Sequence, residues 1–150
     1  AWMDCDLSMP PEVLPKLVAE LGQCDIAVGS RYVAGGRDGR HSRQAQAFSR
    51  IINFAAGLLL GFAIKDYTSG FIAARREVLA ALPLRGDYGE YCIDLLHRAR
   101  RAGFRVVELP YTCTLRLRGV SKTSAGFWGF LRRGIKYVIT ILRLRFRPGN

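Results

Sequence analysis

Apolar and polar positions follow two different periods along this chain, and these periods predict helices separated by short strands. Apolar residues recur every three or four positions in five stretches, which is the spacing of one helix face, so we expect helices at 12–21, 45–64, 75–82, 88–102 and 126–147. Runs of strand length lie at 25–29 and 105–110, followed by an extended run at 111–117. Residues 1–3 are apolar and indicate the end of another buried strand. Strands alternating with helices favour an α/β fold with a mostly parallel sheet.

The expected helix at 45–64 carries no charge between Arg50 and Lys65. This uncharged run is shorter than the ~20 apolar residues that a membrane-spanning helix needs. We therefore predict a helix that is mostly buried in the core or lies on a membrane surface. An arginine retained beside so apolar a run implies a phosphate or carboxylate partner for Arg50.

The expected C-terminal helix has basic residues along one face and apolar residues along the opposite arc. The basic residues are Arg132, Lys136, Arg143 and Arg147. Its longest uncharged run, 137–142, is too short to span a bilayer, so the pattern predicts an in-plane helix at a membrane surface. A terminal helix packed on the domain, with its basic face in water, fits the pattern equally well. We divide the chain into a globular portion, 1–124, and a basic amphipathic tail, 125–150.

Composition adds an electrostatic expectation. The 150 residues include 23 Lys and Arg against 12 Asp and Glu, a net charge of +11, which favours an anionic partner: a nucleic acid, a phosphorylated substrate or an anionic lipid. The chain begins inside an expected strand and without Met, so we expect it to be part of a longer protein; it has no signal-peptide pattern. Four scattered cysteines without zinc-site spacing are expected to be reduced thiols: Cys5, Cys24, Cys92 and Cys113.

Candidate chemistry begins with two carboxylates, Asp4 and Asp6, that directly follow the first apolar run. Carboxylates at a strand end commonly hold a hard divalent cation that also binds substrate phosphates, although Asp is frequent before helices for capping reasons as well. A glycine-rich basic segment follows the strand at 25–29. Because ligands in open α/β sheets bind beyond the carboxyl ends of strands, Arg31 is expected at the same edge as both aspartates, where it suits a phosphate.

Other polar residues leave two interpretations open. The cluster Asp66–Phe71 contains two hydroxyls, a carboxylate and a glycine, which can build either a tight turn or part of a site. Asp94 lies one helical turn before Arg98, so it is either a surface ion-pair partner or a site carboxylate. The remaining arginines of the basic segment are expected in solvent: Arg37, Arg40 and Arg43.

Six motifs along nearly the whole chain stand in the order found in polyprenol-phosphate mannosyltransferases, the dolichol-phosphate mannose synthases of family 2 glycosyltransferases. They are Asp4-Cys5-Asp6-Leu7-Ser8 with Pro10-Pro11, Gly29-Ser30-Arg31-Tyr32 with Gly35-Gly36, Ser49-Arg50 with Asn53, Asp66-Tyr67-Thr68-Ser69-Gly70-Phe71, Val107-Glu108-Leu109-Pro110, and Arg118-Gly119-Val120-Ser121-Lys122. The chain resembles this family, which implies the C-terminal portion of a GT-A (Rossmann-like) glycosyltransferase domain over 1–124. The implied sheet is mixed and mostly parallel, with flanking helices and the amphipathic helix at the end.

The resemblance implies that a hexose, mannose from GDP-mannose, moves to a polyprenyl (dolichyl) phosphate with inversion and with Mg²⁺ or Mn²⁺. The implied partners are the sugar nucleotide, the lipid phosphate, the membrane surface and, as an option, a separate membrane subunit; no nucleic acid is implied. The implied location is the cytoplasmic face of a membrane, peripherally bound. Since the family's site for the nucleotide base lies upstream of Asp4, we expect this chain alone to be inactive.

Residue roles carry over motif by motif. The implied metal ligands are Asp4, Asp6 and Ser8. Arg31 and Arg50 match the arginines that grip the acceptor phosphate. The implied catalytic set is Asp6, Arg31, Arg50 and Asp94, and the implied donor-binding residues are Asp4, Asp66, Ser69, Arg118, Ser121 and Lys122.

Three positions depart from the family pattern. Met9 stands where His is common, Ile72 where Arg is common, and Asp94 where Glu is usual. The first two bear on the donor sugar. Two alternatives therefore stay open: a related enzyme that uses a UDP-glucose or aminoarabinose donor, and a non-catalytic basic protein of the membrane surface. A nucleic-acid-binding module would explain the charge, but no helix-turn-helix, zinc or RRM signature supports it.

Overall fold

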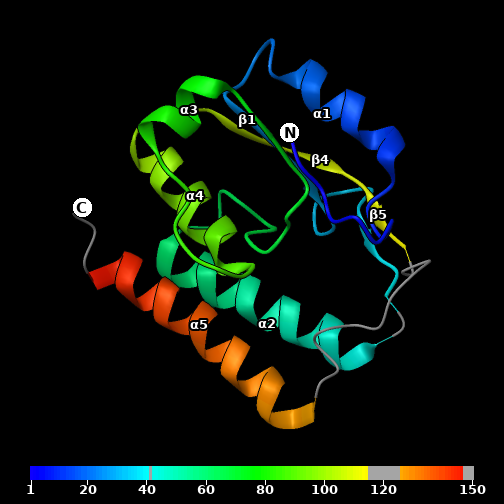
Figure 1. The fold of residues 1–150 in the computed structure, drawn as a ribbon, viewed down its shortest axis with the longest axis vertical. Helices are drawn as coiled ribbons and strands as arrows, with labels where there is room; N and C mark the ends of the chain where they lie inside the picture. Colours follow the sequence, from blue (N-terminus) through cyan, green and yellow to red (C-terminus); the bar gives the residue numbers. More distant parts are fainter. Residues whose placement is uncertain (41, 115–125, 147–150) are drawn as a thin grey trace.

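The computed structural model describes residues 1–40, 42–114 and 126–146, with side chains from residue 134 onward in the last segment. Arg118, Ser121 and Lys122, predicted to bind the donor, lie outside the described residues, as does His41. The elements in chain order are η1 (Pro11–Val13), α1 (Leu14–Glu20), β1 (Ile26–Ser30), β2 (Arg37–Asp38), α2 (Arg43–Leu60), β3 (Ile72–Ala74), α3 (Arg76–Ala81), α4 (Glu90–Arg101), β4 (Val106–Pro110), β5 (Thr112–Cys113) and α5 (Gly126–Phe146) (Figure 1).

Three strands form the central sheet in the order β3-β1-β4. β1 runs parallel to β4 and antiparallel to β3, so the predicted α/β fold is confirmed, with a mixed sheet. Trp2 forms an antiparallel bridge with Ile72, and Ile72 also pairs with Val28. Residues 1–3 therefore run in the same direction as β1, with β3 between them, and Asp4 lies at the level of Ser30. The short strand β3 was not predicted from the sequence.

Both faces of the sheet are covered (Figure 1). Ile26 and Val28 of β1 point into a core shared with α2, α4 and α5, whereas Ala27 points into a second core shared with α1. This alternation is the period of a strand, and burial on both faces explains the continuous apolar run. β1 and β4 run parallel, so their carboxyl ends lie at the same edge, where ligands bind in open α/β sheets.

The helix bounds follow from local chemistry. The hydroxyl of Ser42 accepts a hydrogen bond from the Ala45 N–H at 3.2 Å, so α2 begins with a side-chain cap. It ends before Gly61, whose φ of 111° suits glycine, and this is earlier than the predicted end at residue 64. Pro11 opens a 3₁₀ turn before α1, consistent with the preference of proline for the first turn.

The prediction that α2 is mostly buried is wrong for one of its faces. Ser49, Ile52 and Asn53 point inward, but Ile51, Phe54 and Leu58 are exposed. These three residues are spaced as a single stripe along the helix. The alternative from the sequence, a helix that lies on a membrane surface, stays a prediction.

Two residues of the basic stripe predicted for α5 pair with carboxylates of the domain, whereas the side chains of Arg132 and Arg147 lie outside the described part of the structure. The Lys136 Nζ lies 2.5 Å from an Asp87 oxygen, and an Arg143 nitrogen lies 3.2 Å from an Asp94 oxygen. α5 packs beside both α2 and α4 (Figure 1). The apolar residues that α5 exposes are Ile135, Val138, Ile139, Leu142 and Phe146. Over the described residues, no helix combines the length and apolar character needed to cross a bilayer.

Candidate functional site

The turn that carries Asp4 and Asp6 is held in an uncommon conformation. Leu7 has a φ of 59°, in the left-handed region that a branched residue rarely adopts. An Asp6 Oδ1 atom accepts the Ser8 N–H at 3.0 Å, and Thr114 donates its N–H to the Ser8 carbonyl at 2.9 Å and its hydroxyl to the Leu7 carbonyl at 3.2 Å. These contacts offset the local strain, and such strained turns concentrate at ligand sites.

The 66–71 turn packs against Asp4. A side chain at Gly70 would place its Cβ 4.0 Å from the Asp4 Oδ1 and 3.5 Å from the Tyr91 hydroxyl. The Tyr91 hydroxyl in turn accepts the Trp2 indole N–H at 2.9 Å. The turn therefore lies beside the first carboxylate, at the carboxyl edge of the sheet.

Arg31 follows β1 at the same edge, but its guanidinium is buried and paired. Arg31 is 7% exposed and Asp66 is 0% exposed. The Arg31 Nε donates to Asp66 Oδ2 at 2.8 Å, and an Arg31 terminal nitrogen donates to Asp66 Oδ1 at 2.7 Å. Burial alone would lower the pKa of Arg31, but the charge and hydrogen bonds of Asp66 outweigh it and raise that pKa well above its usual value.

Asp66 is also the centre of a wider hydrogen-bond network. Its carboxylate accepts the backbone N–H of Arg31 at 3.0 Å and the Thr68 hydroxyl at 3.1 Å. The Asn53 amide nitrogen donates to Thr68 at 2.9 Å and to the Ser49 carbonyl at 2.9 Å, which ties the turn to α2. From the sheet side, the Glu108 carboxylate accepts the N–H of Lys65 at 2.7 Å and that of Asp66 at 2.9 Å. The network fixes the 65–68 backbone between β4 and α2.

A second ion pair orders the segment after Arg31. Arg40 donates to Asp38 through its Nε at 2.7 Å, and a terminal nitrogen lies 2.5 Å from the other oxygen. Burial would raise the pKa of Asp38, but these bonds and the charges of Arg40 and Arg31 lower it. The expectation that Arg40 lies in solvent without a partner is therefore wrong. Arg37 and Arg43 are exposed, as expected.

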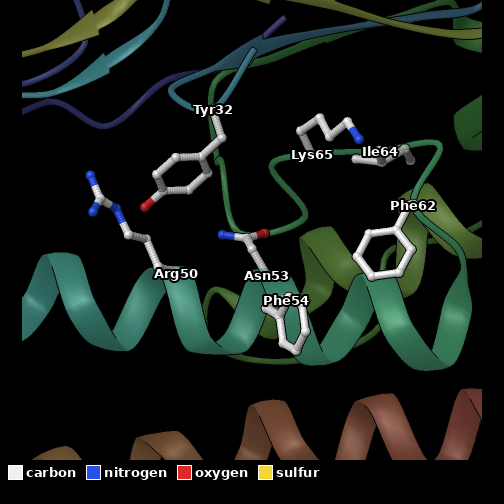
Figure 2. A pocket seen from close by; sticks show the side chains of 7 residues that line it. All are labelled: Tyr32, Arg50, Asn53, Phe54, Phe62, Ile64 and Lys65. Atoms are coloured by element: carbon white, nitrogen blue, oxygen red, sulfur yellow. The ribbon is translucent and has the colours of Figure 1, made fainter.

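A pocket of about 190 Å³ opens between α2 and the 61–65 segment. Figure 2 shows its lining side chains: Tyr32, Arg50, Asn53, Phe54, Phe62, Ile64 and Lys65. Arg50 and Lys65 lie on opposite sides of it, and the Arg50 guanidinium is directed away from the other lining side chains (Figure 2). Burial raises the pKa of Tyr32, so its hydroxyl stays protonated and donates to Asp38 at 3.2 Å. The pocket thus combines two cations, a hydroxyl, an amide and an apolar wall.

Asp94 lies on α4 and faces α5. It is 1% exposed as a side chain, and its oxygens pair with Arg98 at 2.6 Å and with Arg143 at 3.2 Å. The predicted pairing with Arg98 at one helical turn is present, but the pair is more buried than a surface ion pair. These contacts join two helices, and the catalytic role of Asp94 stays a prediction.

The structure brings several of the predicted residues together. Asp4, Arg31 and the 66–71 turn meet at the carboxyl edge of the sheet, and Ser69 there accepts the Phe71 N–H at 3.3 Å. Arg50 lines the neighbouring pocket, beside the residue that follows Arg31. Sequence reasoning missed Lys65 and the double acceptor role of Glu108, although Glu108 lies in a quoted motif. The sequence offered one signal for these two residues: Lys65 is a charged residue next to a polar run, and Glu108 is a charged residue within a run of strand-forming residues.

The donor set at the N-terminal turn fits a hard cation. Asp4 and Asp6 supply carboxylate oxygens from one turn, and Mg²⁺ is commonly held by one or two carboxylates together with substrate phosphates. Ser8, the third predicted ligand, is buried. Within residues 1–40, 42–114 and 126–146, no three His, Cys, Asp or Glu side chains cluster in a way that could hold a metal ion.

Comparisons with known proteins are consistent with this geometry. The family model described as glycosyl transferase family 2 matches residues 1–82. The chain is 44% identical over 126 residues to the polyprenol monophosphomannose synthase of Mycolicibacterium smegmatis, which covers 81% of this chain and 48% of that protein. It is 34% identical over 131 residues to the undecaprenyl-phosphate mannosyltransferase of Micrococcus luteus, covering 85% of this chain and 54% of that protein.

A third relative is the dolichol-phosphate mannosyltransferase of Pyrococcus furiosus, 37% identical over 127 residues, which covers 80% of this chain and 34% of that protein. The chain therefore spans about a third to a half of the length of the curated relatives it matches.

Proposed function

The chain belongs to glycosyl transferase family 2, and from this membership we propose that the protein containing it transfers mannose from GDP-mannose to a polyprenyl phosphate. We call that longer protein the parent protein. The proposed transfer inverts the anomeric centre and depends on Mg²⁺ or Mn²⁺. One observation carries the proposal: strand register sets Asp4 level with the end of β1, where Arg31 and the 66–71 turn meet it. The mixed sheet with flanking helices is that of a GT-A fragment.

In the proposed reaction, Asp4 and Asp6 hold the cation on the donor diphosphate, with Ser8 as a further oxygen. A bound divalent cation acts as a Lewis acid that stabilises charge developing on the leaving diphosphate. Arg118, Ser121 and Lys122, which lie outside the described residues, are proposed to close over the donor. Fixed positive charge in a site closed to water stabilises the same developing charge.

The acceptor supplies the nucleophile. A phosphate monoester is anionic at neutral pH, so its oxygen attacks the anomeric carbon without a strong general base on the protein. Arg50 is proposed to orient that phosphate opposite the leaving group, which is a proximity effect. Arg31 and Asp66 hold the turn that lines the site, and Ser69 lies in the same turn. Asp94 is also proposed to belong to the catalytic set, and this role requires its carboxylate to separate from Arg143.

A lipid acceptor requires contact with a membrane, and the structure offers a surface for it. α2 exposes Ile51, Phe54 and Leu58, and α5, packed beside it, exposes a second apolar stripe. Exposed apolar patches of this kind mark interaction sites. We propose that these two stripes, the apolar face, lie on the cytoplasmic surface of a membrane, where the net charge of +11 favours anionic lipid. A separate membrane subunit remains an optional partner.

A transfer assay tests the proposed function. The parent protein is given a short polyprenyl phosphate and one of three donors, GDP-mannose, UDP-glucose or an aminoarabinose nucleotide, with and without chelator. We expect mannosyl transfer that chelator abolishes, and in Asp6→Asn a loss of about a hundredfold or more with an unchanged circular dichroism spectrum. Asp87→Asn is the matched control, since Asp87 is an exposed carboxylate paired with Lys136.

Transfer from another donor, or transfer that survives both chelator and Asp6→Asn, would contradict the proposal. The 150-residue chain is expected to show no turnover by itself, because the relatives extend well beyond it. Oligonucleotide binding with a steep salt dependence would instead favour a nucleic-acid-binding protein.

A further inference from the structure

A methionine side chain contacts the backbone of the first carboxylate residue. The Asp4 N–H donates a hydrogen bond to the Met9 Sδ at 3.4 Å. A thioether sulfur is a weak acceptor, and here it belongs to a buried side chain, since Met9 is 6% exposed. The bond closes residues 4–9 into a loop that contains both Asp4 and Asp6. Met9 also stands at one of the three positions where the chain departs from the family pattern.

The surroundings of Met9 explain why a methionine suits this position. Met9 belongs to the core on the α1 side of the sheet, together with Leu17, Ala27 and Phe71. A side chain here must be apolar along its length and still present an acceptor to the Asp4 N–H. Methionine is unbranched and adaptable, and it combines both properties. A leucine would fill a similar volume but would offer no acceptor.

Other contacts fix the chain on both sides of Asp4. Upstream, Trp2 exchanges two backbone hydrogen bonds with Ile72, at 2.9 and 3.2 Å. Downstream, the hydrogen bonds from Thr114 hold the carbonyl groups of residues 7 and 8. The Met9 sulfur acts on the stretch between these two anchors, and this stretch carries the first carboxylate.

Met9 also lies beside the 66–71 turn. A Cβ placed on Gly70 would lie 3.9 Å from the Met9 Cε and 4.0 Å from the Asp4 Oδ1, which are ordinary van der Waals distances. The methyl group of Met9 and the carboxylate of Asp4 therefore border the same residue. The Met9 side chain thus reaches from the core to the place where the two turns meet.

We propose that Met9 is a positioning residue for the divalent cation. Its sulfur fixes the Asp4 backbone, and through it the carboxylate that binds the cation, without touching the cation itself. Contacts that orient metal ligands in this way commonly set metal affinity. The inference rests on the proposed function for the role of Asp4 and Asp6 as cation ligands. It assigns to Met9 a role that neither the resemblance nor the relatives supply.

A preference between cations follows from the same geometry. Mg²⁺ demands a nearly ideal octahedral arrangement at short distances, whereas Ca²⁺ accepts longer and more variable ones. A displaced Asp4 carboxylate should therefore weaken the binding of Mg²⁺ more than the binding of Ca²⁺. A change that affected only folding stability would weaken both to the same extent.

Cation binding to the 150-residue chain, without substrates, tests the inference. Mn²⁺ binding is followed by water-proton relaxation, and the affinities for Mg²⁺ and Ca²⁺ are measured by displacement of Mn²⁺. Met9→Leu removes the acceptor, and Met3→Leu is the matched control because Met3 packs against the same core. We expect Met9→Leu to weaken Mg²⁺ binding about fivefold, the net worth of one ordinary hydrogen bond, and Ca²⁺ binding by about twofold or less. Met3→Leu should change neither affinity.

Two results would overturn the inference. One is an equal Mg²⁺ affinity in Met9→Leu and Met3→Leu, and the other is an equal loss of Mg²⁺ and Ca²⁺ binding in Met9→Leu. Urea unfolding without metal checks that both leucine variants fold, as expected because an exchange of methionine for leucine usually costs little in a core.

The transfer assay keeps this failure distinct from failure of the proposed function. In the parent protein, Met9→Leu should raise the Mg²⁺ concentration needed for the half-maximal rate about fivefold, with kcat at saturating Mg²⁺ and KM for the prenyl phosphate unchanged. A parent protein whose transfer needs Mg²⁺ but is indifferent to Met9→Leu would refute the inference alone.

A parent protein that transfers no sugar, while cation binding still depends on Asp6 and Met9, would refute the proposed function alone. Mn²⁺ binding that survives Asp6→Asn unchanged would refute both, because the cation would then lie elsewhere.

Discussion

Asp66→Asn is a substitution that the structure predicts to be strongly damaging to folding. Asp66 is fully buried and its two oxygens accept three hydrogen bonds from Arg31, one from the backbone and two from the guanidinium. An amide in its place removes the compensating charge, and its NH₂ group faces a donor. Arg31 would then be a buried cation without a full counter-charge.

Loss of one partner from a buried ion pair typically costs about 3–5 kcal/mol. A domain of this size is commonly stable by roughly 5–15 kcal/mol, so we expect Asp66→Asn to remove a large part of the free energy of unfolding. Because buried ion pairs can often be replaced by apolar pairs at little cost, the double variant Arg31→Met with Asp66→Leu should recover most of that loss.

Urea unfolding followed by circular dichroism measures these effects. The set comprises the wild-type chain, Asp66→Asn, Asp66→Leu, Arg31→Met, the Met/Leu double variant, and the exposed control Asp87→Asn, whose midpoint should hardly move. A loss below about 1 kcal/mol in Asp66→Asn, the level of a surface ion pair, would refute the reasoning. Strict additivity of the two single losses in the double variant would refute it as well.

Two further predictions concern the helices. Ile139→Ser in the apolar face should lower binding of the chain to anionic vesicles about tenfold in a sedimentation assay, because an aliphatic side chain that would be buried in the membrane is lost. Val18→Ser changes an exposed apolar position on α1 and should have no effect on vesicle binding. Equal losses in the two variants would contradict the membrane contact. Burial and the charges of Arg101 and Arg100 lower the pKa of His97, so its neutral form stabilises the fold at pH 7, and this contribution is lost as the pH falls below the unfolded value near 6.5. His97→Gln should therefore flatten the decline of the free energy of unfolding between pH 7 and 5.5, and an unchanged slope would show that another group is responsible.

The periodicity of the chain located the long elements because their burial is regular. α2, α4 and β4 were predicted within a few residues, since each has one consistent inward face. β3 was missed because it has three residues and owes its position to pairing with β1 and with Trp2. The exposed stripe on α2 was open to misreading, since apolar residues on a membrane-facing surface and in a core have the same pattern.

The positions of the strand ends allowed part of the candidate site to be predicted from the sequence. The rule that ligands bind beyond the carboxyl ends of strands placed Arg31 on the edge of Asp4. It could not indicate that Asp66, far along the chain, neutralises Arg31, because a residue's charge does not reveal its partner. Lys65 was overlooked for the same reason: its place in the pocket depends on the Glu108 carboxylate that fixes its backbone.

The central claim is that the cation held by Asp4 and Asp6 and the phosphate held by Arg50 belong to one cleft. Phosphorus NMR of geranyl phosphate bound to the parent protein, loaded with Mn²⁺ and GDP, tests it most directly, because Mn²⁺ relaxes only nuclei close to it. We predict strong relaxation of the geranyl phosphate signal that is lost in Asp6→Asn, which removes the metal, and in Arg50→Gln, which releases the lipid phosphate. Bound geranyl phosphate whose signal is as slow to relax with Mn²⁺ as with Mg²⁺ would contradict the account.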